Sequence, residues 1–338
     1  MTAPQPKHFQ GIPLSVLDLA PILEGSTAAQ SFKHSTDLAQ HAEKWGFSRY
    51  WLAEHHNMPG IASSATSVMI GHIAGATEHI RVGSGGIMLP NHAALVIAEQ
   101  FGTLESLYPG RIDLGIGRAP GSDQATAFAL RRTLHSRVED FHLQLDELQA
   151  YFDANPSARV RAFPGEGLNI PIWLLGSSDF SARLAAEKGL PFAFASHFAA
   201  DYTLPALNIY RGHFTPSNVL EEPYAMVGVN IIAADTEERA RWLATSQQQQ
   251  FLSLRRGEPT QLKPPIDDID QVWSPFEQAA IEQTLDSRAT IIGTPDTVKQ
   301  KLERFLAETK ANEIIVNSQI FCHEDRLRSY EIVAGLME

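Results

Sequence analysis

Arg-Val-Gly-Ser-Gly-Gly-Ile-Met-Leu-Pro at residues 81–90 and Gly-Arg-Ile-Asp-Leu-Gly-Ile-Gly-Arg-Ala-Pro-Gly at residues 110–121 are the stretches on which the fold depends. In each, a short apolar strand pattern runs into glycines where the strand should end. Glycine there allows a tight turn or the close approach of a ligand to the backbone. Arg118 follows at once and offers a rigid donor fork for phosphate or carboxylate. These stretches predict a floor and a clamp for a phosphorylated planar ligand.

Strand-like and helix-like patterns alternate on both sides of these stretches. Strands are predicted at residues 12–19, 48–53, 80–89, 111–117, 171–175, 191–195, 224–233 and 313–317. Helices are predicted at residues 27–45, 67–76, 95–107, 136–152, 180–188, 204–214, 236–254, 295–309 and 326–336. Both a (β/α)8 barrel and a doubly wound parallel sheet alternate in this way. The strand count favours the barrel, of the α/β TIM-barrel class, with insertions.

A dinucleotide-binding motif at residues 115–121 is excluded by its details. The third glycine, Gly121, stands one place too late for Gly-x-Gly-x-x-Gly, and Pro120 occupies the position where the helix should begin. A Rossmann site is therefore rejected, whereas Arg118 remains a candidate anion ligand.

Composition limits the class of protein. The chain has 338 residues, 43% of them hydrophobic and 20% charged, and no linker divides it, so we expect a single barrel domain over residues 1–338. A formal charge of −12 argues against nucleic acid as a partner. Cys322 is the only cysteine, which fits a reducing compartment. Without an apolar leader or a membrane-length apolar run, we expect a cytoplasmic protein with no membrane partner.

The longest insertion is predicted between the seventh and eighth strands. Residues 257–287 lack clean periodicity and carry Pro259, Pro264, Pro265 and Pro275. A long connection at this point lies on the face where barrels place their active sites, so we interpret this segment as a mobile lid.

Glu54, His55 and His56 follow the second predicted strand. Adjacent side chains of a strand point to opposite faces, so at most one of the two histidines faces the barrel mouth. A histidine there can act as an acid or a base near neutral pH. The alternative is a structural histidine whose neighbour pairs with Glu54. No metal site is predicted, because a His-Glu-x-x-His motif and cysteine ligands are missing.

Three further motifs also carry two interpretations each. Gly85 and Gly86 form either a bulge or turn, or a flat backbone surface under an aromatic ring. Arg118 binds an anion or pairs with an acid such as Asp123. The turn at residues 176–179 is an ordinary helix cap or an anion nest, and one turn can be both.

Taken together, these motifs resemble the bacterial luciferase-like family of flavin-dependent monooxygenases. The stretches that carry the resemblance are Ala-Glu-His-His (53–56), Val-Gly-Ser-Gly-Gly-Ile-Met-Leu-Pro (82–90), Pro-Gly-Arg-Ile-Asp-Leu-Gly-Ile-Gly-Arg-Ala-Pro-Gly (109–121), Leu-Gly-Ser-Ser (175–178) with Gly-Leu-Pro (189–191), and Ile-Gly-Thr-Pro (292–295). They occur in the family's order and span nearly the whole chain.

The resemblance implies a (β/α)8 barrel that takes reduced FMN as cosubstrate, usually from a partner flavin reductase. Oxygen adds to the flavin to give a peroxyflavin, which oxidises a small organic substrate. Members commonly form homodimers. Carried over by position, the catalytic histidine is His55, Gly85-Gly86 is a non-proline cis peptide under the flavin ring, and the phosphate contacts are Arg118, Arg137, Gly176, Ser177 and Ser178.

Relatives leave two other functions open: a dehydrogenase that uses the deazaflavin F420 on the same fold, and a non-catalytic flavin-binding protein. The chain also departs from luciferase itself. Gly117 replaces a cysteine before the phosphate-site arginine, Ser196-His197 follows the sixth strand where luciferase has an aromatic residue, and Pro120-Gly121 replaces a tyrosine. These changes weigh against an aldehyde substrate and light emission and leave the phosphate clamp intact.

Overall fold

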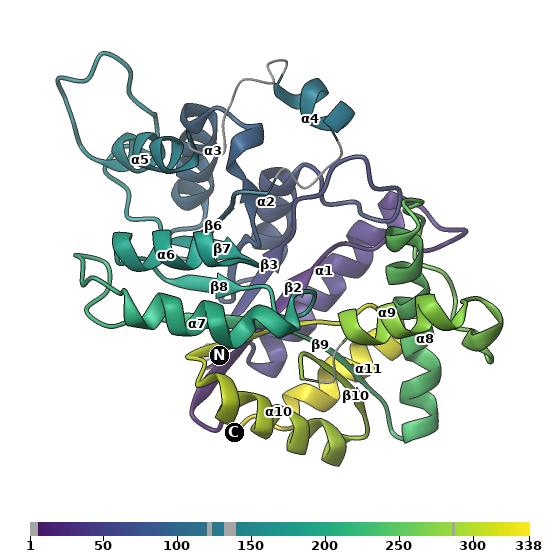
Figure 1. The fold of residues 1–338 in the computed structure, drawn as a ribbon. Coiled ribbons are helices and arrows are strands. Elements are labelled where there is room, and N and C mark those ends of the chain that lie inside the picture. Colours follow the sequence, from purple (N-terminus) through teal and green to yellow (C-terminus); the bar gives the residue numbers. More distant parts are fainter. Residues whose placement is uncertain (1–5, 120–123, 132–139, 286–287) are drawn as a thin grey trace.

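A computed structural model describes residues 6–119, 124–131, 140–285 and 288–338, called the described residues below. Eight parallel strands close into the predicted barrel, surrounded by helices (Figure 1): β2 (Ile12–Asp18), β3 (Arg49–Leu52), β4 (Arg81–Ser84), β6 (Ile112–Gly117), β7 (Ile172–Gly176), β8 (Phe192–Phe194), β9 (Ala225–Ala233) and β11 (Glu313–Asn317). Pairing of β2 with β3, which places Val16 opposite Tyr50, completes the ring. The doubly wound alternative is therefore excluded.

The helices of the described residues are α1 (Ala28–Trp45), α2 (Thr66–Ala76), α3 (Ala94–Leu107), α4 (Gln124–Arg131), α5 (Phe141–Phe152), α6 (Asp179–Lys188), α7 (Thr203–Gly212), α8 (Glu237–Arg255), α9 (Pro275–Thr284), α10 (Pro295–Thr309) and α11 (His323–Ala334). Local sequence sets their ends: Thr27 accepts from the Gln30 N–H at the start of α1, and Gly46 ends it with φ of 89°. Within this part of the chain, no helix is long and apolar enough to cross a membrane.

Some elements differ from the sequence prediction. The third predicted strand is divided into β4 and β5 (Ile87–Met88), because the peptide between Gly85 and Gly86 interrupts it. Two short strands were not predicted: β1 (His8–Phe9), which forms a hairpin with β2, and β10 (Thr290–Gly293). β10 extends the sheet by pairing with the part of β9 that lies beyond its pairing with β8. The predicted helix start at residues 136–139 lies outside the described residues.

The barrel interior is arranged in layers. At the amino ends of the strands, Arg49, Asp113 and Glu313 form a buried ion-pair cluster. The middle layer is apolar and is formed by Leu17, Trp51, Ala53, Trp173, Ala193, Met226 and Ile315. A second, larger apolar core lies between the barrel and its helices. With its amino end and centre filled by the described residues, the interior leaves a cavity at the carboxyl ends of the strands.

The segment at residues 257–287 has more regular structure than its sequence predicts. It contains α9, which begins with a capping box between Ser274 and Glu277. Leu262 forms a parallel bridge with Leu23, with its N–H 2.9 Å from the Ile22 carbonyl oxygen. Trp273 and Ile281 pack on Leu252 of α8. The described part of this segment is thus packed against the barrel-end loops.

Candidate active site

A cavity of about 400 Å³ lies at the carboxyl ends of the barrel strands. Every predicted site residue that the structure describes lines this cavity: His55, Gly85, Gly86, Arg118, Gly176, Ser177 and Ser178. Arg137, also predicted, lies outside the described residues. Residues from the ends of four strands, β3, β4, β6 and β7, therefore meet at one place, which is where TIM-barrel enzymes bind their substrates.

The floor of the cavity is the backbone at Gly85 and Gly86. The peptide bond between them is cis, as the resemblance implies, and it lies between β4 and β5. A Cβ atom on Gly86 would lie 2.8 Å from the carbonyl oxygen of Gly115, and one on Gly85 would lie 2.7 Å from Leu17 Cδ1. A side chain at Gly86 would thus clash with backbone, whereas one at Gly85 would require the end of the Leu17 side chain to move.

Arg118 and the start of α6 form the polar side of the cavity. The Arg118 guanidinium lies 4.2 Å from the centre of the Phe180 ring and makes no ion pair with a described residue. The alternative partner Asp123 lies outside the described residues. Ser178 is the N-cap residue of α6, yet its side chain makes no capping hydrogen bond. The first turn of α6 therefore presents N–H groups and a hydroxyl that α6 itself does not use.

The two neighbouring histidines point in different directions, as strand alternation predicts. His55 lines the cavity, whereas His56 is absent from its wall and faces Glu54. Burial lowers the pKa of His55 below its ordinary value, so the ring is neutral at pH 7. His55 is thus the histidine that faces the cavity, and His56 is the neighbour that pairs with Glu54.

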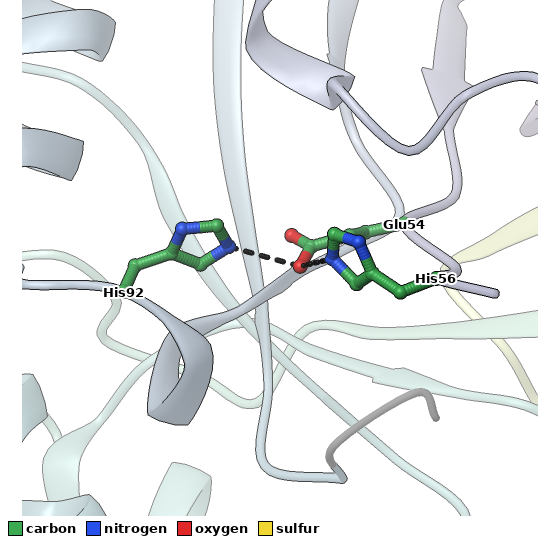
Figure 2. A group of neighbouring side chains, drawn as sticks. All are labelled: Glu54, His56 and His92. Atoms are coloured by element: carbon green, nitrogen blue, oxygen red, sulfur yellow. Dashed lines mark hydrogen bonds and ion pairs between the residues drawn. The ribbon is translucent and has the colours of Figure 1, made fainter. Parts of the chain in front are cut away.

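Glu54 joins the end of β3 to the segment after β5. Figure 2 shows His56 and His92 on either side of its carboxylate, with Nε2 atoms 2.7 and 2.9 Å from Oε1. The Met88 N–H donates to Oε2 at 3.0 Å. Burial opposes ionisation, but the bonds from His92, His56 and Met88 hold the Glu54 pKa below its ordinary value. The three side chains could also surround a cation, since their ligand atoms lie within 4.8 Å.

Sequence reasoning noted His197 only as a departure from luciferase and did not place it in the site. The structure brings it into the cavity wall, together with Trp51, Gln250 and Asn317. Strand alternation could have found Trp51 and Asn317, which share faces with Arg49 and Glu313. Gln250 belongs to the glutamine run that the pattern assigns to solvent, and its burial follows from how α8 crosses the cavity.

A closed barrel with a cavity lined from its strand ends is the architecture of TIM-barrel enzymes. This chain belongs to the luciferase-like monooxygenase family, whose sequence profile matches residues 12–313. The protein YvbT of Bacillus subtilis is 65% identical over 96% of both chains. A luciferase-like monooxygenase of Escherichia coli K12 is 57% identical over 97% of both. The crystal structure of apo-MsnO8 superposes with a TM-score of 0.90, at 34% identity over 96% of this chain and 98% of that one.

More distant relatives carry more specific names. An N-acetyl-S-alkylcysteine monooxygenase of B. subtilis is 33% identical over 96% of this chain and 97% of its own. Two solved structures share the fold at lower identity: a type II Baeyer-Villiger monooxygenase component with FMN (TM-score 0.71, 17%) and an F420-dependent secondary alcohol dehydrogenase (TM-score 0.68, 11%). The first alignment covers 96% of this chain and 98% of the monooxygenase component, and the second covers 97% of this chain and 99% of the dehydrogenase. One fold thus accommodates both flavin-type cofactors.

Proposed function

We propose that this protein is an FMN-dependent monooxygenase that uses reduced FMN and oxygen to oxidise a small organic substrate. The observation that carries the proposal is the convergence of all seven described candidate residues on one cavity. The family membership and the relative named as a monooxygenase support the reaction class.

The polar side of the cavity fits the phosphate of FMN. Arg118 has no acidic partner among the described residues, and the first turn of α6 offers N–H groups beside the Ser177 and Ser178 hydroxyls. A helix N-terminus stabilises an anion, and a guanidinium adds a charge-assisted hydrogen bond. By the family resemblance, Arg137 is proposed as a second phosphate contact.

The glycine floor fits the flavin ring. Bare backbone at Gly85 and Gly86 leaves a flat surface, and the apolar side chains of Trp51, Met88 and Leu175 border it. When bound, reduced FMN supplies the electrons that activate oxygen. The chain's own part is to hold the ring in place and exclude water from it, with residues 257–287 as the covering segment.

His55 is the residue we assign to proton and hydrogen-bond chemistry beside the ring. Its imidazole is neutral at pH 7, so it offers one N–H donor and one acceptor nitrogen to the cavity. Glu54 does not contact the cavity and acts as a positioning residue, because it fixes the backbone on either side of the site. A His55→Ala variant that binds FMN normally and turns over at the wild-type rate would exclude this role.

The decisive experiment measures FMN binding and oxygen consumption together. Isothermal titration of oxidised FMN should show Kd rising about 10- to 100-fold in Arg118→Ala, because one charge-assisted contact contributes about 1.5–3 kcal/mol. Arg183→Ala is the matched control, since Arg183 is exposed on α6 and does not line the cavity. Unchanged affinity in Arg118→Ala would contradict the phosphate assignment.

The same preparation separates the competing functions. Titration with F420 in parallel shows which cofactor binds more tightly, and a dehydrogenase would transfer hydride without oxygen. Photoreduced FMN bound to the protein should consume oxygen when a substrate is present; binding without consumption would indicate a flavin carrier. The relative's name makes organic sulfides a sensible first substrate panel.

We also propose a cytoplasmic homodimer that receives reduced flavin from a reductase. Helices α2 and α3 expose Val68, Val96 and Leu107, with 71%, 42% and 62% of their surfaces accessible, so this face is the proposed interface. Sedimentation velocity would show a monomer throughout if the dimer assignment is wrong, and Val68→Lys should weaken a true dimer.

A further inference from the structure

His197 lines the cavity but takes no part in the FMN site proposed above. It follows β8, and its backbone carbonyl accepts a hydrogen bond of 2.7 Å from Nδ2 of Asn230 on β9. The Asn230 amide is buried and fully used, because Nδ2 also donates to Thr290 Oγ1 and Oδ1 accepts from Asn317 Nδ2. The turn that carries His197 is therefore held in place by a buried polar network.

The ring of His197 occupies space that a glycine leaves open. A Cβ atom at Gly228 of β9 would lie 2.3 Å from Nδ1 and 3.0 Å from Cε1 of the imidazole. Any other residue at position 228 would force the ring out of its place. The hydrogen bond from Asn230 to the His197 carbonyl oxygen and the space left by Gly228 together fix the position of His197 in the cavity wall.

The two ring nitrogens have different surroundings. Nδ1 is enclosed against Gly228 and has no hydrogen-bond partner among the described residues, whereas Nε2 is not enclosed in this way. Burial, assisted by the neighbouring His55, lowers the pKa of His197 to about 4, so the imidazole carries one proton at pH 7. A buried N–H without an acceptor is rarer than a buried lone pair without a donor. The proton therefore belongs on Nε2, which faces the cavity.

The rest of the cavity wall defines what this donor can bind. Among the described residues, the wall contains no aspartate or glutamate, and Arg118 is its single lysine or arginine. Most other lining side chains are apolar. A charged group near His197 would lose its hydration without gaining a counter-ion, whereas an uncharged oxygen would gain a hydrogen bond.

We propose that His197 binds the organic substrate by donating Nε2–H to an uncharged oxygen acceptor such as a carbonyl group. The inference rests on the proposed function only in naming that ligand as the substrate. It makes His197 a specificity-determining residue that selects for an oxygen-bearing group in a cavity whose other lining side chains are mostly apolar.

The test compares two probes of nearly equal shape, cyclohexanone and methylenecyclohexane, which differ in one acceptor oxygen. Equilibrium binding is measured on the protein saturated with oxidised FMN and repeated without FMN. The wild type should bind the ketone about tenfold more tightly, the value of one hydrogen bond in a desolvated site. On the FMN-saturated protein, where the phosphate is expected to occupy Arg118, cyclohexanecarboxylate should bind more weakly than the ketone because its charge finds no free partner.

Three variants decide whether His197 is the cause. His197→Leu removes the donor, and Gly228→Ala displaces the ring without changing it. In both variants the ratio of the dissociation constants of the two probes should be close to one. Gly212→Ala is the control, because a Cβ atom there meets nothing within 4 Å, and it should keep the preference. A preference that survives in His197→Leu overturns the proposal. A loss of FMN affinity with an unchanged probe ratio would assign His197 to the cofactor and overturns it too.

A second measurement needs no variant that must fold. In ¹⁵N-histidine-labelled wild-type protein, the His197 ring should show the Nε2–H tautomer at pH 7 and a shift of that nitrogen when cyclohexanone is added. A proton on Nδ1 contradicts the proposal. Because neither measurement requires turnover, absence of monooxygenase activity would leave this test intact and would count against the proposed function alone.

Discussion

At the amino end of the barrel interior Arg49 donates to Asp113 at 2.7 Å and to Glu313 at 3.0 Å, whereas at the carboxyl end Nδ1 of His197 has no partner among the described residues. The same contrast extends to neighbouring groups. Glu313 also accepts hydrogen bonds from Ser15 and Tyr224. Asn317, four residues later on the same face of β11, leaves its Oδ1 atom without a partner among the described residues. The polar groups at one end of the barrel pair with one another, whereas the other end leaves buried polar atoms without a partner among the described residues.

The largest effect is expected at the amino end. Burial would lower the pKa of Arg49, but the Asp113 and Glu313 carboxylates raise it, so the three groups are interdependent. Arg49→Leu leaves two buried carboxylates without their shared cation and should reduce the free energy of unfolding by about 3–5 kcal/mol in urea titrations. Arg81→Leu is the control: it also removes a partner of Asp113 but leaves Arg49, and should cost less. Equal decreases in the free energy of unfolding in the two variants would contradict the central role of Arg49 in this cluster.

An intermediate effect is expected from pH at the carboxyl end. The pKa of His197 is about 4 in the folded protein, because of burial, and about 6.5 in the unfolded chain. Below pH 6.5 the unfolded chain therefore binds a proton at this histidine that the folded protein does not bind. The free energy of unfolding falls as a result until about pH 4. The free energy of unfolding should therefore decrease between pH 7.5 and pH 5 by up to about 2 kcal/mol less in His197→Gln than in the wild type.

Urea titrations at the two pH values measure this difference. His213→Gln, at an exposed position, serves as the control and should lose as much stability as the wild type. An unchanged pH dependence in His197→Gln would show that other groups cause the acid loss, with His55, whose pKa is also lowered by burial, the first to examine.

The smallest effect is expected at two helix caps. Thr27 accepts from the Gln30 N–H, and Thr27→Ala should cost about 1 kcal/mol. Ser178 occupies the same position of α6 without making that bond, so Ser178→Ala should change stability by less than about 0.5 kcal/mol while weakening FMN binding. Unfolding and FMN titrations of both variants check this, and a full capping cost at Ser178 would place its hydroxyl in the fold instead of the site.

The sequence predicted the barrel because strands buried on both faces read as short apolar runs separated by capped helices. It missed β10, which consists of four residues and exists because β9 extends past β8 and leaves an edge to pair. It missed α9 because four prolines obscure the periodicity of a helix that depends on its capping box.

Within the site, the residue pattern singled out positions such as Gly86 and Arg118 but left their roles open, and the family resemblance supplied the roles. The role of His197 depends on contacts with Gly228 and Asn230, which lie more than 30 positions away and become neighbours only when β9 pairs with β8. Such an arrangement leaves no local signal. The lowered pKa of His55 likewise follows from tertiary burial.

The aromatic column inside the barrel has a further consequence, for optical measurements. Trp51 lines the cavity, and Trp173 meets it edge-on with ring centres 5.2 Å apart, with Tyr224 beyond at 5.6 Å. Tryptophan emission overlaps flavin absorption, so a flavin on the Gly85-Gly86 floor would quench these two indoles by energy transfer. A fall in this emission during an FMN titration would report occupancy of the floor on which the flavin is proposed to rest.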